Sequence, residues 1–132
     1  MFKIKKEIVN QTDIDKIEKI IRDRKLAHTF LLANKSKVYK AFLDMEEATY
    51  SDGALEKRIK ELIAIGISIV INCESCLEWH IHEALKSGAT KAQIIEAIEV
   101  GIEMSGGPGT VSSRFAFKVL EYYTKNDSSN RR

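Results

Sequence analysis

Apolar residues recur every three or four positions along most of this 132-residue chain, and that spacing limits the fold more than any other feature. It is the period of an amphipathic helix, whereas the alternation typical of a half-buried strand is rare here. The sequence therefore predicts an all-α fold, a compact bundle of about six helices. A chain of this length fits one domain with a real core, so we expect a single domain over residues 1–132.

Capping residues and glycines divide the chain into segments of helical length. A short polar side chain can accept a hydrogen bond from a free amide at a helix start, and a glycine often ends a helix in the left-handed conformation. By these signals the expected helices begin near Thr12 or Asp13, at Ser36, near Leu55, near Glu74, after Thr90 and near Thr110. Gly88 is expected to end the fourth helix, close to Lys86.

Three segments depart from the regular pattern. Residues Ile65–Ile71 alternate β-branched and small side chains, which alone would fit a buried strand, but the helical pattern on both sides favours a helix. The run Gly106–Gly109 contains Pro108 and is expected to be a tight turn rather than helix. The polar residues 126–132 are expected to form a frayed, disordered tail.

The third and fifth expected helices are apolar around much of their circumference. A bundle of this size has a limited interior to cover such surfaces. Some of this surface is therefore expected to meet another subunit, and we expect a homo-oligomer.

The charge pattern excludes several classes of function. The chain carries 21 basic and 19 acidic residues, a formal net charge of +2, without a concentrated basic patch that would indicate nucleic acid binding. The first ten residues lack the continuous apolar stretch of a signal peptide, and the longest apolar run, Leu62–Ile71, is too short to span a bilayer. We therefore expect a cytoplasmic protein that binds neither nucleic acid nor membrane.

Cys73 and Cys76 are the only cysteines of the chain, and they lie three positions apart. In a reducing compartment this spacing indicates redox or metal chemistry rather than a structural cross-link. If a helix begins near Cys73, that residue lies at or near the N-cap and Cys76 in the first turn. Free amides and the positive end of the helix dipole then favour thiolate over thiol.

A histidine and a glutamate can complete this site. His80 lies four residues after Cys76, one turn further on the same helix face, where an imidazole can take the thiol proton or stabilise the thiolate. Glu61 precedes Cys73 by twelve residues on the preceding helix. Two antiparallel helices joined near Asn72 could bring Glu61 alongside His80, although a solvated surface charge is the simpler expectation for it.

The pattern Cys-x-x-Cys-x-x-x-His, the upstream Glu61 and the following Gly-Ala-Thr-Lys-x-x-Ile resemble the carboxymuconolactone decarboxylase-like superfamily. Within it they are similar to the alkyl hydroperoxide reductase D-like (AhpD-like) branch. The resemblance covers residues from about Ser36 to Tyr123, the expected core of the domain.

This resemblance implies an all-α fold that assembles as trimers or hexamers, and dithiol-dependent reduction of peroxides without a cofactor. It implies that Cys76 attacks the peroxide and that Cys73 then resolves the sulfenic acid as a disulfide. Glu61 and His80 match the proton-relay positions. An external dithiol, a thioredoxin-like or lipoyl protein, would restore the pair.

One position departs from the family pattern. The best-known peroxidases of the branch carry a histidine immediately before the second cysteine, where this chain has Ser75. Serine is not a base at neutral pH, so the relay would be shorter and general disulfide exchange remains an alternative reaction. The decarboxylase branch does not depend on a cysteine pair, so lactone decarboxylation is not expected.

Two alternatives belong to other classes of function. Zinc could be held by Cys73, Cys76 and His80, with Glu61 or water as a fourth ligand. The chain could instead be a helical scaffold that binds a partner, with incidental cysteines. Among the remaining candidates, His28 is expected to have a hydrogen-bonded structural role, while His82, Trp79, Tyr122 and Tyr123 are assigned to surface contacts or packing.

Overall fold

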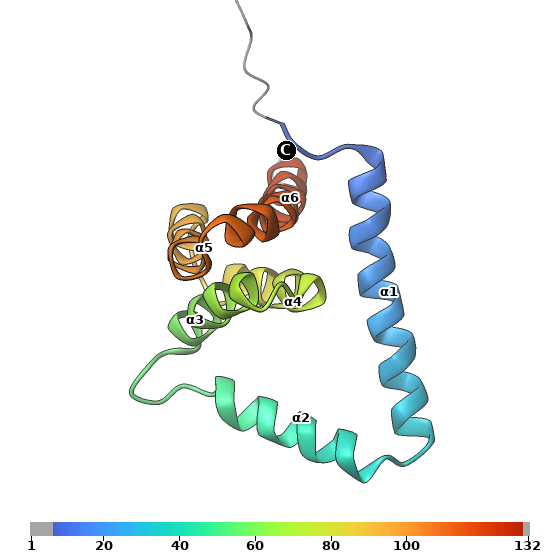
Figure 1. Cartoon of the computed structure of the whole chain (residues 1–132). Coiled ribbons are helices and arrows are strands. Elements are labelled where there is room, and N and C mark those ends of the chain that lie inside the picture. Colours follow the sequence, from blue (N-terminus) through green and yellow to red (C-terminus); the bar gives the residue numbers. More distant parts are fainter. Residues whose placement is uncertain (1–6, 131–132) are drawn as a thin grey trace, which may run out of the picture.

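The structure is a computed structural model that describes residues 7–130, with side chains as far as Lys125. Every regular element in this part of the chain is a helix, which confirms the predicted all-α fold (Figure 1). The helices are α1 (Gln11–Ala33), α2 (Lys37–Tyr50), α3 (Lys57–Val70), α4 (Glu74–Lys86), α5 (Lys91–Ser105) and α6 (Gly107–Asn130). None of these helices is both long and apolar enough to cross a membrane.

Helices α3 to α6 form a bundle whose core is aliphatic. Helix α3 packs against both α4 and α5, and α6 lies across α4 and α5. The core side chains are fully or almost fully buried and include Ile65, Ile69, Leu77, Ile81, Ile94, Ile98, Val119 and Leu120. Burial of one such side chain contributes about 1.5–3 kcal/mol. The segment predicted as helix rather than strand, Ile65–Ile71, supplies two of them.

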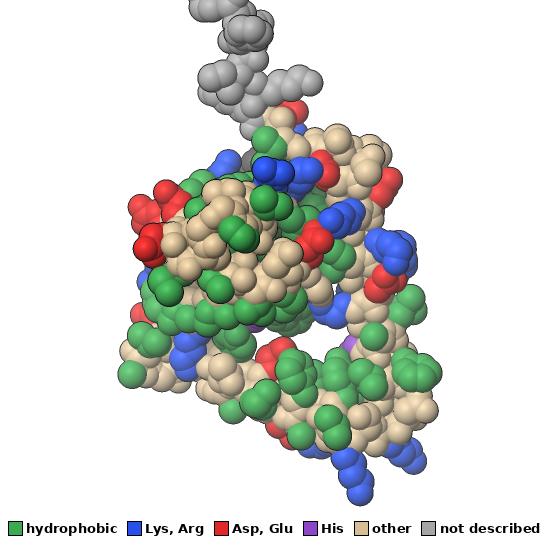
Figure 2. Space-filling view, in the orientation of Figure 1, with side chains coloured by type: hydrophobic (Ala, Val, Ile, Leu, Met, Phe, Trp, Pro, Cys, Tyr) green, Lys and Arg blue, Asp and Glu red, His purple; other side chains and the backbone are tan. Residues whose placement is uncertain are grey.

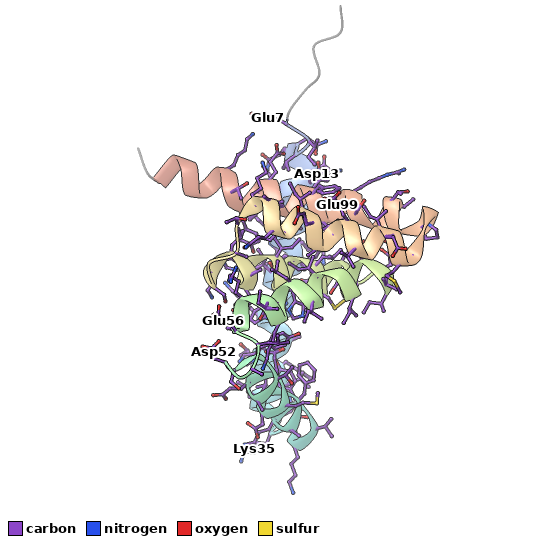
Figure 3. All side chains as sticks on the ribbon, turned by 90° about the vertical axis from the view of Figure 1, so that its left-hand side faces the viewer. Glu7, Asp13, Lys35, Asp52, Glu56 and Glu99 are labelled. Carbon is purple, nitrogen blue, oxygen red and sulfur yellow. A yellow bond between two sulfur atoms is a disulfide. The ribbon has the colours of Figure 1, made fainter. Side chains whose placement is uncertain are left out.

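Helices α1 and α2 form an arm beside this bundle rather than a further layer of it (Figure 1). Of the residues in α1 only Ile17 is buried, and within Lys37–Tyr50 no residue is buried. Figure 3 shows Lys35 at the far tip of the arm, and Asp52 and Glu56 where the chain returns to the bundle. The apolar side expected for α2 therefore remains largely exposed, with Val38 82% accessible.

Most of the predicted helix ends are confirmed. Ser36 caps α2, Gly88 has a positive φ of 94°, and Thr90 and Gln93 form a capping box at the start of α5. At α1 the prediction was wrong: the cap is Asn10, and Asp13 closes the box as the third helical residue. An Asp three positions after an Asn can accept a hydrogen bond from the cap amide, as Asp13 Oδ2 does from the Asn10 N–H at 3.0 Å.

The glycine-proline run is the clearest correction to the expected elements. Only Gly106 leaves the helical conformation, with φ 70°, and α6 begins at Gly107 instead of near Thr110. Pro108 is tolerated because amides in a first helical turn need no intrahelical partner. Gly109 is buried where α5 and α6 cross, and a Cβ there would lie 2.9 Å from the Cα of Ile102.

The two remaining differences are shifts of helix ends. Helix α3 begins at Lys57, two residues after Leu55. Helix α6 continues to Asn130, into the tail expected at 126–132, because a helix that has already formed gains one backbone bond for each residue it adds. Residues 131 and 132 lie outside the described part of the chain.

Candidate active site

The two cysteines lie at the start of α4, where the sequence placed them. Asn72 adopts a positive φ of 53°, a conformation that asparagine tolerates better than most residues, and turns the chain from α3 into α4. Cys73 is the N-cap, and its Sγ accepts a hydrogen bond from the Cys76 amide at 3.2 Å. The two sulfurs form a disulfide, and both residues are half-buried. The pair thus lies at the positive end of the α4 dipole.

Glu61 and His80 contact each other, and His80 lies four residues after Cys76 on α4. The antiparallel arrangement of α3 and α4 brings Glu61 Oε2 within 2.7 Å of His80 Nδ1, the contact that the spacing allowed but did not favour. The Glu61 side chain is 1% exposed and that of His80 15%. Glu61 is therefore a buried carboxylate bonded to an imidazole, which rules out the simpler expectation of a solvated surface charge. In this arrangement Glu61 fixes the orientation of the ring.

Lys57 and Glu83 extend the ionic network. Lys57 Nζ lies 3.3 Å from Glu61 Oε1 and 2.7 Å from Glu83 Oε2. Burial disfavours the ammonium ion, but the hydrogen bond to Glu83 and the charge of Glu61 outweigh it and raise the pKa of Lys57. Burial likewise opposes the Glu83 carboxylate, and hydrogen bonds from Lys57 and Lys86 nevertheless lower its pKa.

The arm supplies Tyr50 to the same place. Its ring lies 5.3 Å from the ring of His80, and burial together with the negative charge of Glu61 raises the pKa of the Tyr50 hydroxyl. A hollow of about 390 Å³ between α2 and the bundle reaches Glu61, Lys57 and Trp79, and Figure 2 shows an opening between α2 and the bundle. A small molecule can therefore approach the buried carboxylate from the side of the arm.

Sequence reasoning missed these three neighbours. A partial signal existed for Lys57, since a lysine four residues before a glutamate faces it on a helix. No local pattern indicated Tyr50, because its position depends on how the arm returns to the bundle.

A second buried carboxylate, Glu78, lies on α4, whereas Glu61 lies on α3. It is 1% exposed and accepts hydrogen bonds from Arg24 Nη1 at 2.5 Å and from the Tyr123 hydroxyl at 2.6 Å. Burial and the bond to Glu78 raise the pKa of Tyr123. Arg24 also contacts Ser75 through Nη2, at 2.9 Å from the carbonyl oxygen and 3.0 Å from Oγ. The sequence predicted packing alone for Tyr123 and singled out neither Arg24 nor Glu78.

The other singled-out side chains have structural contacts. His28 Nδ1 lies 2.7 Å from the Tyr39 hydroxyl, which confirms its hydrogen-bonded role. His82 stacks on Tyr123 with ring centres 4.2 Å apart. The guanidinium of Arg24 lies over the ring of Trp79 at 5.2 Å.

The zinc alternative requires the reduced pair, because sulfurs bonded to one another are not thiolate ligands. Within the described residues, no three His, Cys, Asp or Glu side chains are grouped so as to hold a metal ion.

Comparison with known proteins places this geometry in a family. The chain is 42% identical over 81 residues to uncharacterised protein 4 in the cox locus of Paracoccus denitrificans. The matched segment covers 61% of this chain and 73% of that protein. An uncharacterised protein of Cupriavidus necator is 37% identical over 83 residues, or 63% and 71% of the two chains.

Solved structures share the fold. The apo crystal structure of a carboxymuconolactone decarboxylase family protein from Legionella pneumophila superposes with a TM-score of 0.78 at 27% identity, over 83% of this chain and 97% of that one. A Thermotoga maritima protein of the same family, with a suggested part in the antioxidative response, superposes with a TM-score of 0.78 at 23% identity, over 86% of this chain and 97% of that one. At this low identity the likeness shows the fold alone.

The sequence model of one family matches residues 36–119, from the cap of α2 to within α6. This segment contains both cysteines, Glu61 and His80, and makes up more than half of the chain. The protein therefore belongs to the carboxymuconolactone decarboxylase family.

Proposed function

We propose that this protein is a dithiol-dependent oxidoreductase of the AhpD-like type, which reduces hydroperoxides or disulfides with Cys76 as the attacking thiol. The observation that carries the proposal is the 2.7 Å contact between Glu61 and His80, one helical turn from a cysteine pair at a helix start. A buried carboxylate that holds an imidazole near a thiol is the arrangement that activates a nucleophile.

In the oxidative half, the Cys76 thiolate attacks one oxygen of the hydroperoxide. The oxygen–oxygen bond breaks, Cys76 becomes a sulfenic acid, and the departing alkoxide takes a proton from His80. The Cys73 thiol then attacks the sulfenic sulfur, the disulfide forms and water leaves. With a disulfide as substrate, the same thiolate attacks a sulfur and the pair closes by exchange.

In the reductive half, one thiolate of an external dithiol attacks Cys76 Sγ, forms a mixed disulfide and expels Cys73 as a thiolate. This direction of attack is supported by the Cys76 amide, which donates to Cys73 Sγ at 3.2 Å and would stabilise the negative charge. A better stabilised thiolate leaves faster. The second thiol of the donor then attacks the donor sulfur of the mixed disulfide, releases Cys76 and leaves the donor oxidised. A thioredoxin-like or lipoyl protein supplies the dithiol in this proposal, and the reducing cytoplasm is the proposed compartment.

The pH dependence of thiol alkylation, resolved by site with mass spectrometry, tests the proposal on reduced, metal-free protein. We expect Cys76 to react with an apparent pKa clearly below the ordinary value of about 8.5. His80→Ala should raise that pKa, because the imidazole is lost, while His82→Ala on the same helix should leave it unchanged. The rate of hydroperoxide consumption with a dithiol donor should fall in His80→Ala and should stay unchanged in His82→Ala.

Two results would contradict the redox proposal. Thiols that alkylate only after chelation, together with stoichiometric zinc in the purified protein, would favour a metal site. A Cys76→Ser variant with full biological activity would favour a scaffold.

A further inference from the structure

We infer that Arg24 is a positioning residue for the cysteine pair, an α1 side chain that holds the turn between Cys73 and Cys76. The inference rests on the dithiol chemistry proposed above and adds to it a residue outside the segment 36–119 that the family shares.

The contact falls within the motif itself. Nη2 of Arg24 donates to both the carbonyl oxygen and Oγ of Ser75, at 2.9 and 3.0 Å, and Ser75 directly precedes Cys76. Ser75 is an exposed residue in the first turn of α4, so local helix bonds alone hold it weakly. The guanidinium supplies a further fixed point for the backbone next to the proposed nucleophile.

Arg24 is itself held in place. Its other terminal nitrogen, Nη1, lies 2.5 Å from Glu78, whose carboxylate is 1% exposed and also accepts the Tyr123 hydroxyl at 2.6 Å. A guanidinium can divide its donors between two acceptors in fixed directions, whereas a lysine ammonium is a single point. The arginine thus connects the cysteine turn to an anchored carboxylate.

Helix α1 makes a second contact with the same turn, and it serves as a control. Lys16 Nζ lies 2.6 Å from Glu74 Oε2, so each of the two residues between the cysteines has a basic partner on α1. The Lys16–Glu74 pair is half exposed on both sides, at 52% and 42%, and such pairs contribute little. The positioning role therefore falls to Arg24.

The consequence concerns the equilibrium between dithiol and disulfide. In the disulfide the covalent bond closes the turn, whereas in the dithiol only hydrogen bonds keep the two sulfurs near each other. A fixed turn raises the effective concentration of one thiol for the other and so favours closure. Because Glu78 neutralises the guanidinium, Arg24 should affect this equilibrium more than the acidity of Cys76.

The test is equilibration of the full-length protein with graded reduced and oxidised dithiothreitol, with the disulfide fraction read by acid quench and alkylation. Arg24→Lys keeps the charge beside Glu78 but loses the double contact with Ser75. We expect it to make the disulfide about tenfold easier to reduce, a shift of ~30 mV. The double variant R24Q/E78Q, which leaves no unpaired buried carboxylate, should shift equally, and Lys16→Gln should not shift.

Other outcomes would overturn the inference. They are an unchanged equilibrium in both Arg24 variants, an equal shift in Lys16→Gln, or a shift that appears only as a raised alkylation pKa of Cys76. Circular dichroism and thermal unfolding identify variants that do not fold, and Arg24→Lys then remains as the decisive variant. If the unmodified protein equilibrates with dithiothreitol but catalyses the reduction of neither hydroperoxides nor protein disulfides, the proposed function fails, while the Arg24 shift is still measured and stands or falls alone. If its cysteines do not exchange at all, both proposals fail.

Discussion

At the scale of single residues, Glu61 is the side chain on which the proposed chemistry depends most. It is buried, it bonds to His80 at 2.7 Å, and a hollow reaches it from the side of the arm. The carboxylate lies against Nδ1 and so holds the ring in the orientation in which it can take and return a proton. Loss of this carboxylate should therefore slow the step in which His80 returns that proton.

We predict that Glu61→Gln lowers the rate of peroxide or disulfide reduction about a hundredfold, within the range of general acid–base catalysis. Gln retains the size of the side chain and one hydrogen bond to the ring. The matched control is Glu83→Gln, which also removes a carboxylate bonded to Lys57 but does not touch His80. Single-turnover kinetics of the reduced protein would measure both. Equal losses in the two variants would show that the Lys57 network, rather than the relay, limits the rate.

The residues of the motif could be predicted from sequence because their geometry is mostly local. Cys73, Cys76 and His80 lie within eight consecutive residues of one helix start, where spacing fixes their relative positions. Glu61 needed only the antiparallel hairpin of α3 and α4. Arg24 is 54 residues from Glu78, and its contact depends on how α1 lies against the bundle, which periodicity does not specify.

At the scale of helices, the contact between α3 and α5 requires a glycine. A Cβ at Gly101 would lie 2.7 Å from the carbonyl oxygen of Gly66 and 2.7 Å from Cβ of Ile69. Both are parts of α3 that cannot rotate away. The two helices can therefore approach this closely only without a side chain at position 101.

We predict that Gly101→Ala destabilises the protein by about 1–3 kcal/mol, the usual cost of overpacking a core. Gly107→Ala is the control, because a Cβ there meets nothing within 4 Å and alanine favours the helical backbone. Urea unfolding at one protein concentration and one redox state would compare them. A Gly101→Ala protein as stable as the unmodified one would mean that α3 and α5 can separate without cost.

Helix identities followed from periodicity, but some helix ends did not. The sequence placed α4 correctly because a cap and a glycine bound it. It misplaced the start of α6, since a proline among glycines is typical of a turn and is also allowed in the first turn of a helix. What decides between them is the close crossing of α5 and α6 at Gly109, a tertiary contact.

At the scale of the whole molecule, the bundle exposes an apolar groove between α3 and α5. Its volume is about 680 Å³, and its walls include Ile63, Ile67, Val70, Val100 and Met104. Each of these five side chains is between 46% and 71% exposed. A surface of this kind on a small bundle indicates a partner, and we propose that copies of this chain cover it in a homotrimer or homohexamer.

We predict that Ile67→Lys, at a residue that lines this groove, dissociates the oligomer, so that sedimentation velocity finds a lower molar mass than for the unmodified protein. A charge cannot be buried there without a partner. Val38→Lys is the comparison, since Val38 is 82% exposed on the arm and lies outside the groove. If Val38→Lys dissociates the protein and Ile67→Lys does not, the arm forms the contact between subunits.

The contacts of Glu78 show that the residues that hold the proposed site extend beyond the segment 36–119 that the family shares. Both hydrogen-bond donors to this carboxylate come from outside residues 36–119, Arg24 from α1 and Tyr123 from the second half of α6. A gene shortened to the shared segment would keep every residue of the proposed reaction, yet Glu78 would lose both donors. Arg24, Glu78 and Tyr123 thus form one interacting set that extends beyond both ends of the shared segment, and a change at position 78 removes an acceptor from both of the other two.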